Sequence, residues 1–164
     1  MIAAKLHKKF GEELPVITWR CSERSTKTDK AFYLELNQAF GFPSSVKHGE
    51  TAFDLKQRLE NAIKLDTERT VYRKCVLFVD EAQWLLEREF NWLISLYNEL
   101  DWDGSRLIVF LVGQKLEMGQ MLEKLRKEKK QQILGRFFTR IFIFHSITVS
   151  DMIISPQAAS FVCP

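Results

Sequence analysis

Residues 75–83, CVLFVDEAQ, decide the fold, because they form a short apolar run that ends in two adjacent carboxylates. Residues 76–79 show no alternation of polar and apolar side chains, which is typical of a parallel strand buried on both faces. In open α/β sheets, ligands bind outside the carboxyl ends of the strands. We therefore expect Asp80 and Glu81 to emerge at a ligand site.

Strand and helix patterns alternate on both sides of this stretch. Strands are predicted over residues 16–21, 107–112 and 140–144, and helices over residues 1–10, 30–40, 52–71, 87–100 and 117–134. This order predicts an α/β domain with a parallel sheet, flanking helices and right-handed crossovers. Residues 150–164 show neither the helical nor the strand periodicity. We expect one domain over residues 1–149 and an unstructured or degenerate tail over residues 150–164.

The composition sets few limits on partners. The chain has 24 Lys and Arg against 21 Asp and Glu, and this small excess does not by itself indicate nucleic-acid binding. No apolar run approaches the ~20 residues of a membrane span, so no membrane contact is expected. Cys21, Cys75 and Cys163 lie far apart without a C-x-x-C pair, which favours a reducing, cytoplasmic location.

The acidic pair after the apolar run has the pattern of a Walker B motif. Asp80 is expected to hold Mg²⁺, directly or through water, because hard cations prefer carboxylate oxygens. Glu81 could orient a water molecule for in-line attack on a γ-phosphate. The alternative is that the two carboxylates only stabilise the N-terminus of the following helix.

Three further residues are candidate catalytic groups. Gln114 follows the strand at residues 107–112, where its amide could touch a γ-phosphate or the attacking water; an ordinary strand-to-helix turn is the alternative. Arg136 precedes the last predicted strand and Arg140 begins it; there a guanidinium could stabilise phosphoryl charge in a neighbouring subunit or form a surface salt bridge. A nearby basic run could contact DNA phosphates or form a solvated helix face, and it comprises Lys124, Arg126, Lys127, Lys129 and Lys130.

These motifs together resemble the bacterial AAA+ ATPases of the TniB, TnsC and ExeA kind. The resemblance rests on CVLFVDEAQ, FNWLISLYNEL, RLIVFLVGQ and ILGRFFTR, and it covers about residues 1–148. It implies a P-loop NTPase-like (AAA+) fold in which Asp80 holds the metal and Glu81 is the base. Gln114 matches the sensor position, and Arg136 and Arg140 match recurrent arginine positions. The resemblance also implies ATP and Mg²⁺ as ligands of the complete family protein, a homo-oligomer, and DNA and a transposase as possible partners.

The chain departs from this family in two respects: it lacks the phosphate-binding motif, and we expect the C-terminal helical lid to be absent or degenerate after Asp151. No G-x-x-x-x-G-K-[ST] occurs in the 164 residues, so the sequence identifies no cofactor-binding residue of a phosphate cradle. The family's first strand and P-loop would precede the helix at residues 1–10, and we expect their absence to leave strand edges unpaired. A gene fragment or an internal start would account for this pattern.

Three functions remain open. The first is an ATP-binding and ATP-hydrolysing regulator that selects the target of DNA transposition. The second is a non-catalytic interaction module that retains the AAA+ surface. The absent P-loop favours this second function for the 164-residue chain. The third is an ExeA-like secretion ATPase, which would be expected to carry a peptidoglycan-binding or membrane segment downstream.

Overall fold

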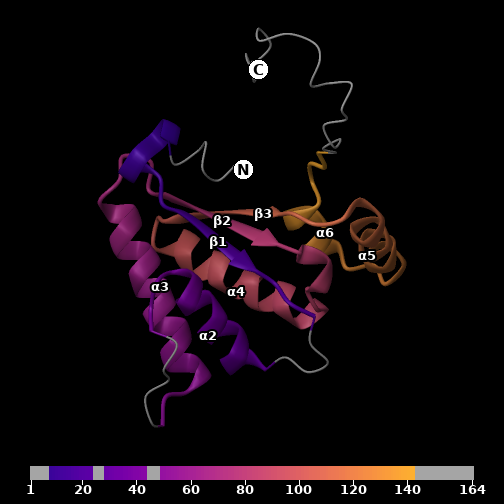
Figure 1. Cartoon of the computed structure of the whole chain (residues 1–164), viewed down its shortest axis with the longest axis horizontal. Helices are drawn as coiled ribbons and strands as arrows, with labels where there is room; N and C mark the ends of the chain where they lie inside the picture. Colours follow the sequence, from indigo (N-terminus) through magenta and orange to yellow (C-terminus); the bar gives the residue numbers. More distant parts are fainter. Residues whose placement is uncertain (1–7, 24–27, 44–48, 143–164) are drawn as a thin grey trace, which may run out of the picture.

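The computed structural model describes residues 8–23, 28–43 and 49–142, in which strands and helices alternate (Figure 1). The elements in chain order are η1 Gly11–Glu13, β1 Val16–Arg20, α2 Asp29–Ala39, α3 Ala52–Glu68, β2 Lys74–Asp80, η2 Ala82–Trp84, α4 Glu87–Trp102, β3 Arg106–Leu111, α5 Lys115–Lys127 and α6 Gln131–Phe137.

The three described strands form one parallel sheet in the order β1-β2-β3. The central strand β2 pairs with both neighbours, so that Leu77 lies beside Ile17 on one side and beside Val109 on the other. Its five inner residues are all buried. The sequence prediction of a parallel α/β sheet around this strand is therefore confirmed.

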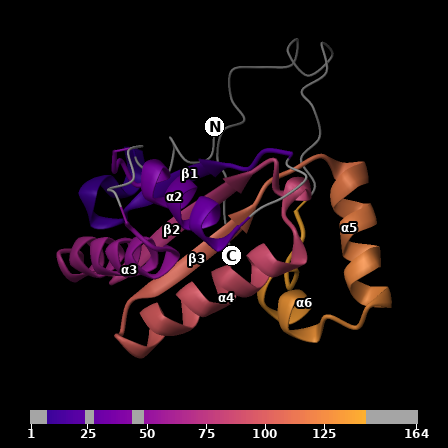
Figure 2. The ribbon, with the colours of Figure 1, turned by 90° about the horizontal axis from the view of Figure 1, so that it is seen from below.

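Helices α2, α3 and α4 cover one face of the sheet, while α5 lies beyond the carboxyl ends of the strands (Figure 2). Trp19, Leu77 and Leu107 of the three strands point into this layer. They form a single buried core with apolar side chains of the helices, including Phe32, Leu36, Leu55, Leu59, Ile63, Phe90 and Leu93. This core fixes the direction in which β2 delivers Asp80 and Glu81.

The opposite face of the sheet has a much smaller apolar cluster. Val76 and Phe78 of β2 are buried there with Leu14. Phe110 of β3 stacks on Phe78, with ring centroids 5.0 Å apart, but its side chain remains exposed, as does that of Ile108. The sheet is thus thickly covered on one face and thinly covered on the other.

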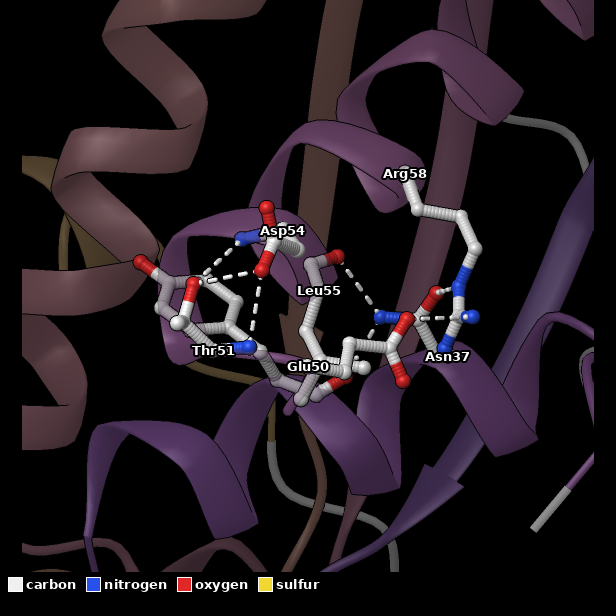
Figure 3. Close-up of polar contacts among 7 residues, drawn as sticks. Asn37, Glu50, Thr51, Asp54, Leu55 and Arg58 are labelled. Atoms are coloured by element: carbon white, nitrogen blue, oxygen red, sulfur yellow. Dashed lines mark hydrogen bonds and ion pairs between the residues drawn. The ribbon is translucent and has the colours of Figure 1, made fainter. Parts of the chain in front are cut away.

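A buried amide joins helices α2 and α3 (Figure 3). The Nδ2 group of Asn37, which is fully buried, donates to the carbonyl oxygens of Tyr33 at 2.7 Å and Leu55 at 2.9 Å. Its Oδ1 accepts a hydrogen bond from Arg58 Nε at 2.9 Å, and Arg58 also pairs with Glu50 at 2.8 Å. Two of these three hydrogen bonds of the Asn37 amide, to Leu55 and from Arg58, cross from α2 to α3 and fix the relative position of the two helices.

Helix α3 begins with a capping box (Figure 3). Asp54 N donates to Thr51 Oγ1 at 3.2 Å, and the Asp54 carboxylate accepts from Thr51 N at 2.8 Å and from Thr51 Oγ1 at 2.7 Å. These bonds satisfy N–H groups that a helix start otherwise leaves without partners.

Two predicted elements differ in the structure. The helix predicted over residues 117–134 is two helices, α5 and α6, because the chain turns at Lys129 in a left-handed conformation with φ of 53°. Of the strand predicted over residues 140–144, residues 140–142 are not in a strand, and residues 143–144 lie outside the described part. Most of the predicted helix at residues 1–10 and the whole tail at residues 150–164 also lie outside it. None of the described helices is long and apolar enough to cross a membrane.

Candidate functional site

The acidic pair lies where the central strand ends. Asp80 is the last residue of β2, and its main-chain carbonyl accepts a hydrogen bond from Cys21 N at 2.9 Å, which ties it to the end of β1. Glu81 has left-handed backbone angles, φ 55° and ψ 40°. This conformation is uncommon for a residue with a side chain and costs about 1–3 kcal/mol, so neighbouring contacts must hold it. Both side chains are partly exposed at the carboxyl edge of the sheet.

Main-chain hydrogen bonds join this turn to the end of β3. Val112 N donates to Val79 O at 2.9 Å, and Ala82 N donates back to Val112 O at 2.8 Å. The ladder between β2 and β3 therefore continues past the last strand residues. As a result, Glu81 and Gln114 belong to adjoining turns, as expected for two neighbouring parallel strands.

Gln83 connects these two turns through its side chain. Its Nε2 donates to Glu81 Oε2 at 2.6 Å, and its Oε1 accepts from the backbone N–H of Gln114 at 3.4 Å. Gln83 is not among the site residues predicted from the sequence, although it stands two residues after Glu81 in the same motif. Arg20, the register partner of Asp80 on β1, is not among them either.

Gln114 lies at the N-cap position of α5, with an exposed side chain that makes no capping hydrogen bond. Its side chain is thus available at the same edge as the acidic pair. The structure brings Asp80, Glu81 and Gln114 together.

Arg136 makes its contacts away from this group, and Arg140 is exposed after the end of α6. Arg136 Nη1 donates to Asn98 Oδ1 at 2.8 Å, and its guanidinium lies 5.0 Å from the ring centroid of Tyr97. It also borders an open cavity of about 460 Å³ beside residues 107–109, the first half of β3. Glu81 follows the opposite end of the parallel strands. In the described structure Arg136 therefore contacts Asn98 and Tyr97 rather than the acidic pair.

The basic run lies on the surface at the end of α5. Lys124, Arg126, Lys127 and Lys129 are exposed. Lys130 instead forms an ion pair with Glu87 at 2.6 Å, and the hydrogen bond to that carboxylate raises the pKa of Lys130. Four of the five cations remain accessible to an anionic partner.

The donor chemistry of the site fits a magnesium ion that is shared with a nucleotide. Within the described ranges, no group of three or more His, Cys, Asp and Glu residues could enclose a metal ion. Mg²⁺ keeps several waters and is usually bound by one or two carboxylates together with substrate phosphates. Asp80 offers one such carboxylate, whereas the 164 residues contain no P-loop motif for the phosphates.

The chain matches the model of a known protein family. The family model described as an AAA domain matches residues 1–122. No curated protein and no solved structure matches the chain significantly.

Proposed function

Because the chain belongs to the AAA domain family, we propose that it supplies the Walker B and sensor elements of an ATP-hydrolysing AAA unit. The family and the P-loop NTPase-like α/β fold together indicate an ATP-binding, NTPase-like function. The observation that carries the catalytic part of the proposal is the position of Glu81. It follows the central strand and is tied through Gln83 to the turn that contains Gln114.

Each residue of the site has a distinct proposed role. Bound Mg²⁺-ATP would supply the phosphoryl group and the metal charge, and Asp80 would hold the metal ion. Glu81 would orient a water molecule and accept its proton. The Gln114 amide would contact the terminal phosphate or that water. These roles divide metal binding, base catalysis and phosphate sensing between two neighbouring strand ends.

Calorimetry and turnover together test this assignment. We expect the 164-residue chain alone to show no saturable Mg²⁺-ATP isotherm at micromolar concentration, because a P-loop supplies most phosphate contacts in P-loop NTPases. A version extended by a strand and a P-loop should bind and hydrolyse ATP. In that version, Glu81→Gln should retain binding and lose turnover, whereas Asp80→Ala should weaken Mg²⁺-dependent binding. Turnover by Glu81→Gln at the parental rate would refute the role of Glu81.

We further propose that Arg136 acts across a subunit boundary in a homo-oligomer, since members of the family often assemble. Mixing Arg136→Ala with Glu81→Gln in the extended version should restore part of the turnover, because some interfaces then pair an intact Glu81 with an intact Arg136. Neither variant should be active alone. Full activity of Arg136→Ala by itself would transfer the role to Arg140 and leave Arg136 as a surface charge.

We propose DNA transposition as the biological setting, with DNA and a transposase as partners and a cytoplasmic location. The support is the resemblance of the motifs to TniB-like and TnsC-like ATPases and the exposed cations at the end of α5. Replacing Lys124, Arg126 and Lys127 by Gln should weaken duplex DNA binding and reduce its salt dependence in a fluorescence titration. Unchanged affinity and salt slope would favour the non-catalytic interaction module or the ExeA-like secretion ATPase.

A further inference from the structure

The Gln83 side chain makes two contacts with different partners. Its amide nitrogen donates to the Glu81 carboxylate at 2.6 Å, a short distance typical of a hydrogen bond to a charged acceptor. Its amide oxygen faces the backbone N–H of Gln114 at 3.4 Å, which is the long end of the hydrogen-bond range. The first contact is therefore the stronger one. The planar amide of Gln83 thus connects the Glu81 carboxylate to the backbone that follows β3.

Gly113 gives independent evidence for the close approach of this amide. A Cβ atom built on Gly113 would lie 2.3 Å from Gln83 Oε1, and 2.9 Å and 3.0 Å from Cγ and Sδ of Met118. The amide therefore lies directly against the backbone of the turn between β3 and α5. The backbone of Gly113 is outside the left-handed region, so its lack of a side chain serves this contact rather than an unusual conformation.

The backbone around Glu81 explains why its carboxylate needs a tether. Glu81 belongs neither to β2 nor to η2, and its left-handed conformation turns the chain sharply between them. Its N–H donates to Asp80 Oδ1 at 3.1 Å, which positions the main chain but not the Glu81 carboxylate. A Glu side chain has three rotatable bonds, so its direction is set by contacts such as that with Gln83.

We propose that Gln83 is a positioning residue that couples the Glu81 carboxylate to the turn at Gly113 and Gln114. A displacement of the Gln114 backbone would move the Gln83 amide and with it the hydrogen-bonded carboxylate. The consequence for catalysis rests on the proposed role of Glu81: contact between Gln114 and a phosphate would change the placement of the base. The coupling itself does not depend on that role.

Nuclear magnetic resonance of the labelled 164-residue chain tests the coupling without nucleotide. Glu81→Gln should shift both the side-chain amide resonances of Gln83 and the backbone amide resonance of Gln114. In a Gln83→Met background, which keeps the chain length but removes the amide, Glu81→Gln should leave the Gln114 resonance unchanged. Gln57→Met, at an exposed position of α3, is the matched control in which the shift of Gln114 should persist.

Two results would overturn the proposal. One is the absence of any Gln114 shift on Glu81→Gln in the parent, and the other is a shift of equal size in the Gln83→Met background. If Gln83→Met does not fold, Gln83→Ala removes both the donor and the acceptor of the amide. It should break the coupling in the same way.

Turnover provides the functional readout in the version extended by a P-loop. Gln83→Met should lower kcat by about tenfold or more and leave KM nearly unchanged, because the base is misplaced while nucleotide contacts remain. An unchanged kcat would refute the positioning role. If the parent itself shows no turnover, the proposed ATPase function fails, and the resonance experiment still decides the coupling.

Discussion

At the scale of single residues, the site depends on side chains that occupy one small space between two turns. Gly113, Gln83 and Met118 meet there within distances that leave no room for another carbon atom. Overpacking of such a space generally costs about 1–3 kcal/mol. The cost depends on whether the surrounding side chains can move away.

Gly113→Ala is predicted to lower the free energy of unfolding by about 1–3 kcal/mol, because its Cβ would meet the Gln83 amide oxygen. In a Gln83→Ala background the same substitution should cost less, since part of the space is then empty. Urea denaturation of the four proteins in this double-mutant cycle measures the difference. Equal costs in both backgrounds would place the clash at Met118 alone.

Gly119→Ala serves as the control for the loss of glycine. Nothing lies within 4 Å of its added Cβ on helix α5. Alanine is favoured over glycine inside a helix, so the substitution should stabilise the chain by about 0.5–1 kcal/mol. Opposite signs at Gly113 and Gly119 would separate steric contact from helix propensity.

At the scale of elements, the contact between α2 and α3 depends on the buried amide of Asn37. Asn37→Ala should destabilise the chain by about 1–3 kcal/mol, because Arg58 Nε loses its acceptor in a partly buried position. Gln38→Ala, at the next and exposed position of α2, should have a much smaller effect. Urea unfolding measures both, and equal effects would contradict a special role for Asn37.

The capping box of α3 should make stability depend on acid pH. Hydrogen bonds from the Thr51 side chain and backbone lower the pKa of Asp54 from its usual 3.8. A carboxyl group with a lowered folded-state pKa contributes stability above pH 3.8, and this contribution is lost as the pH falls through the folded-state value.

Asp54→Asn is therefore predicted to destabilise the chain at pH 7 and to have a smaller effect below pH 3.8. Chemical denaturation of both proteins across this range measures the change. Gln57→Ala, on the same helix, should give a difference that does not vary with pH. The same destabilisation by Asp54→Asn at every pH would show that the charge of the cap is unimportant.

The sequence predicted the elements that local patterns determine. The run around Leu77 predicted a buried central strand, and the carboxylates after it were expected at the edge of the sheet. The break near Lys129 was not predictable, because the charged residues around it are good helix formers and no Gly or Pro marks a stop. There, packing of Phe137 against Phe90 of α4 accompanies the change of direction, with ring centroids 5.4 Å apart. The role of Gln83 was missed because its contact with Gln114 spans 31 residues and depends on strand order.

At the scale of the whole molecule, two buried groups in the core make the free energy of unfolding depend on pH in the alkaline range. Burial raises the pKa of the Cys75 thiol on the central strand from 9.0 to about 12, with a smaller contribution from the charge of Asp66. Burial also raises the pKa of Tyr33 from 10.0 to about 12, with contributions from Glu60 and Asp29. In each case the folded protein holds a proton that the unfolded chain releases at a lower pH.

Such groups contribute stability that is complete below the unfolded pKa and is lost as the pH rises towards the folded value. For Cys75 the loss begins near pH 9, about one unit before that of Tyr33. The free energy of unfolding, measured with urea, should therefore fall between pH 9 and 10 more steeply in the parent than in Cys75→Ala. The substitution also removes a buried sulfur atom, which lowers stability by a constant amount at all pH values. The prediction thus concerns the slope, and parallel curves for the two proteins over this interval would show that the Cys75 thiol is not held protonated by the core.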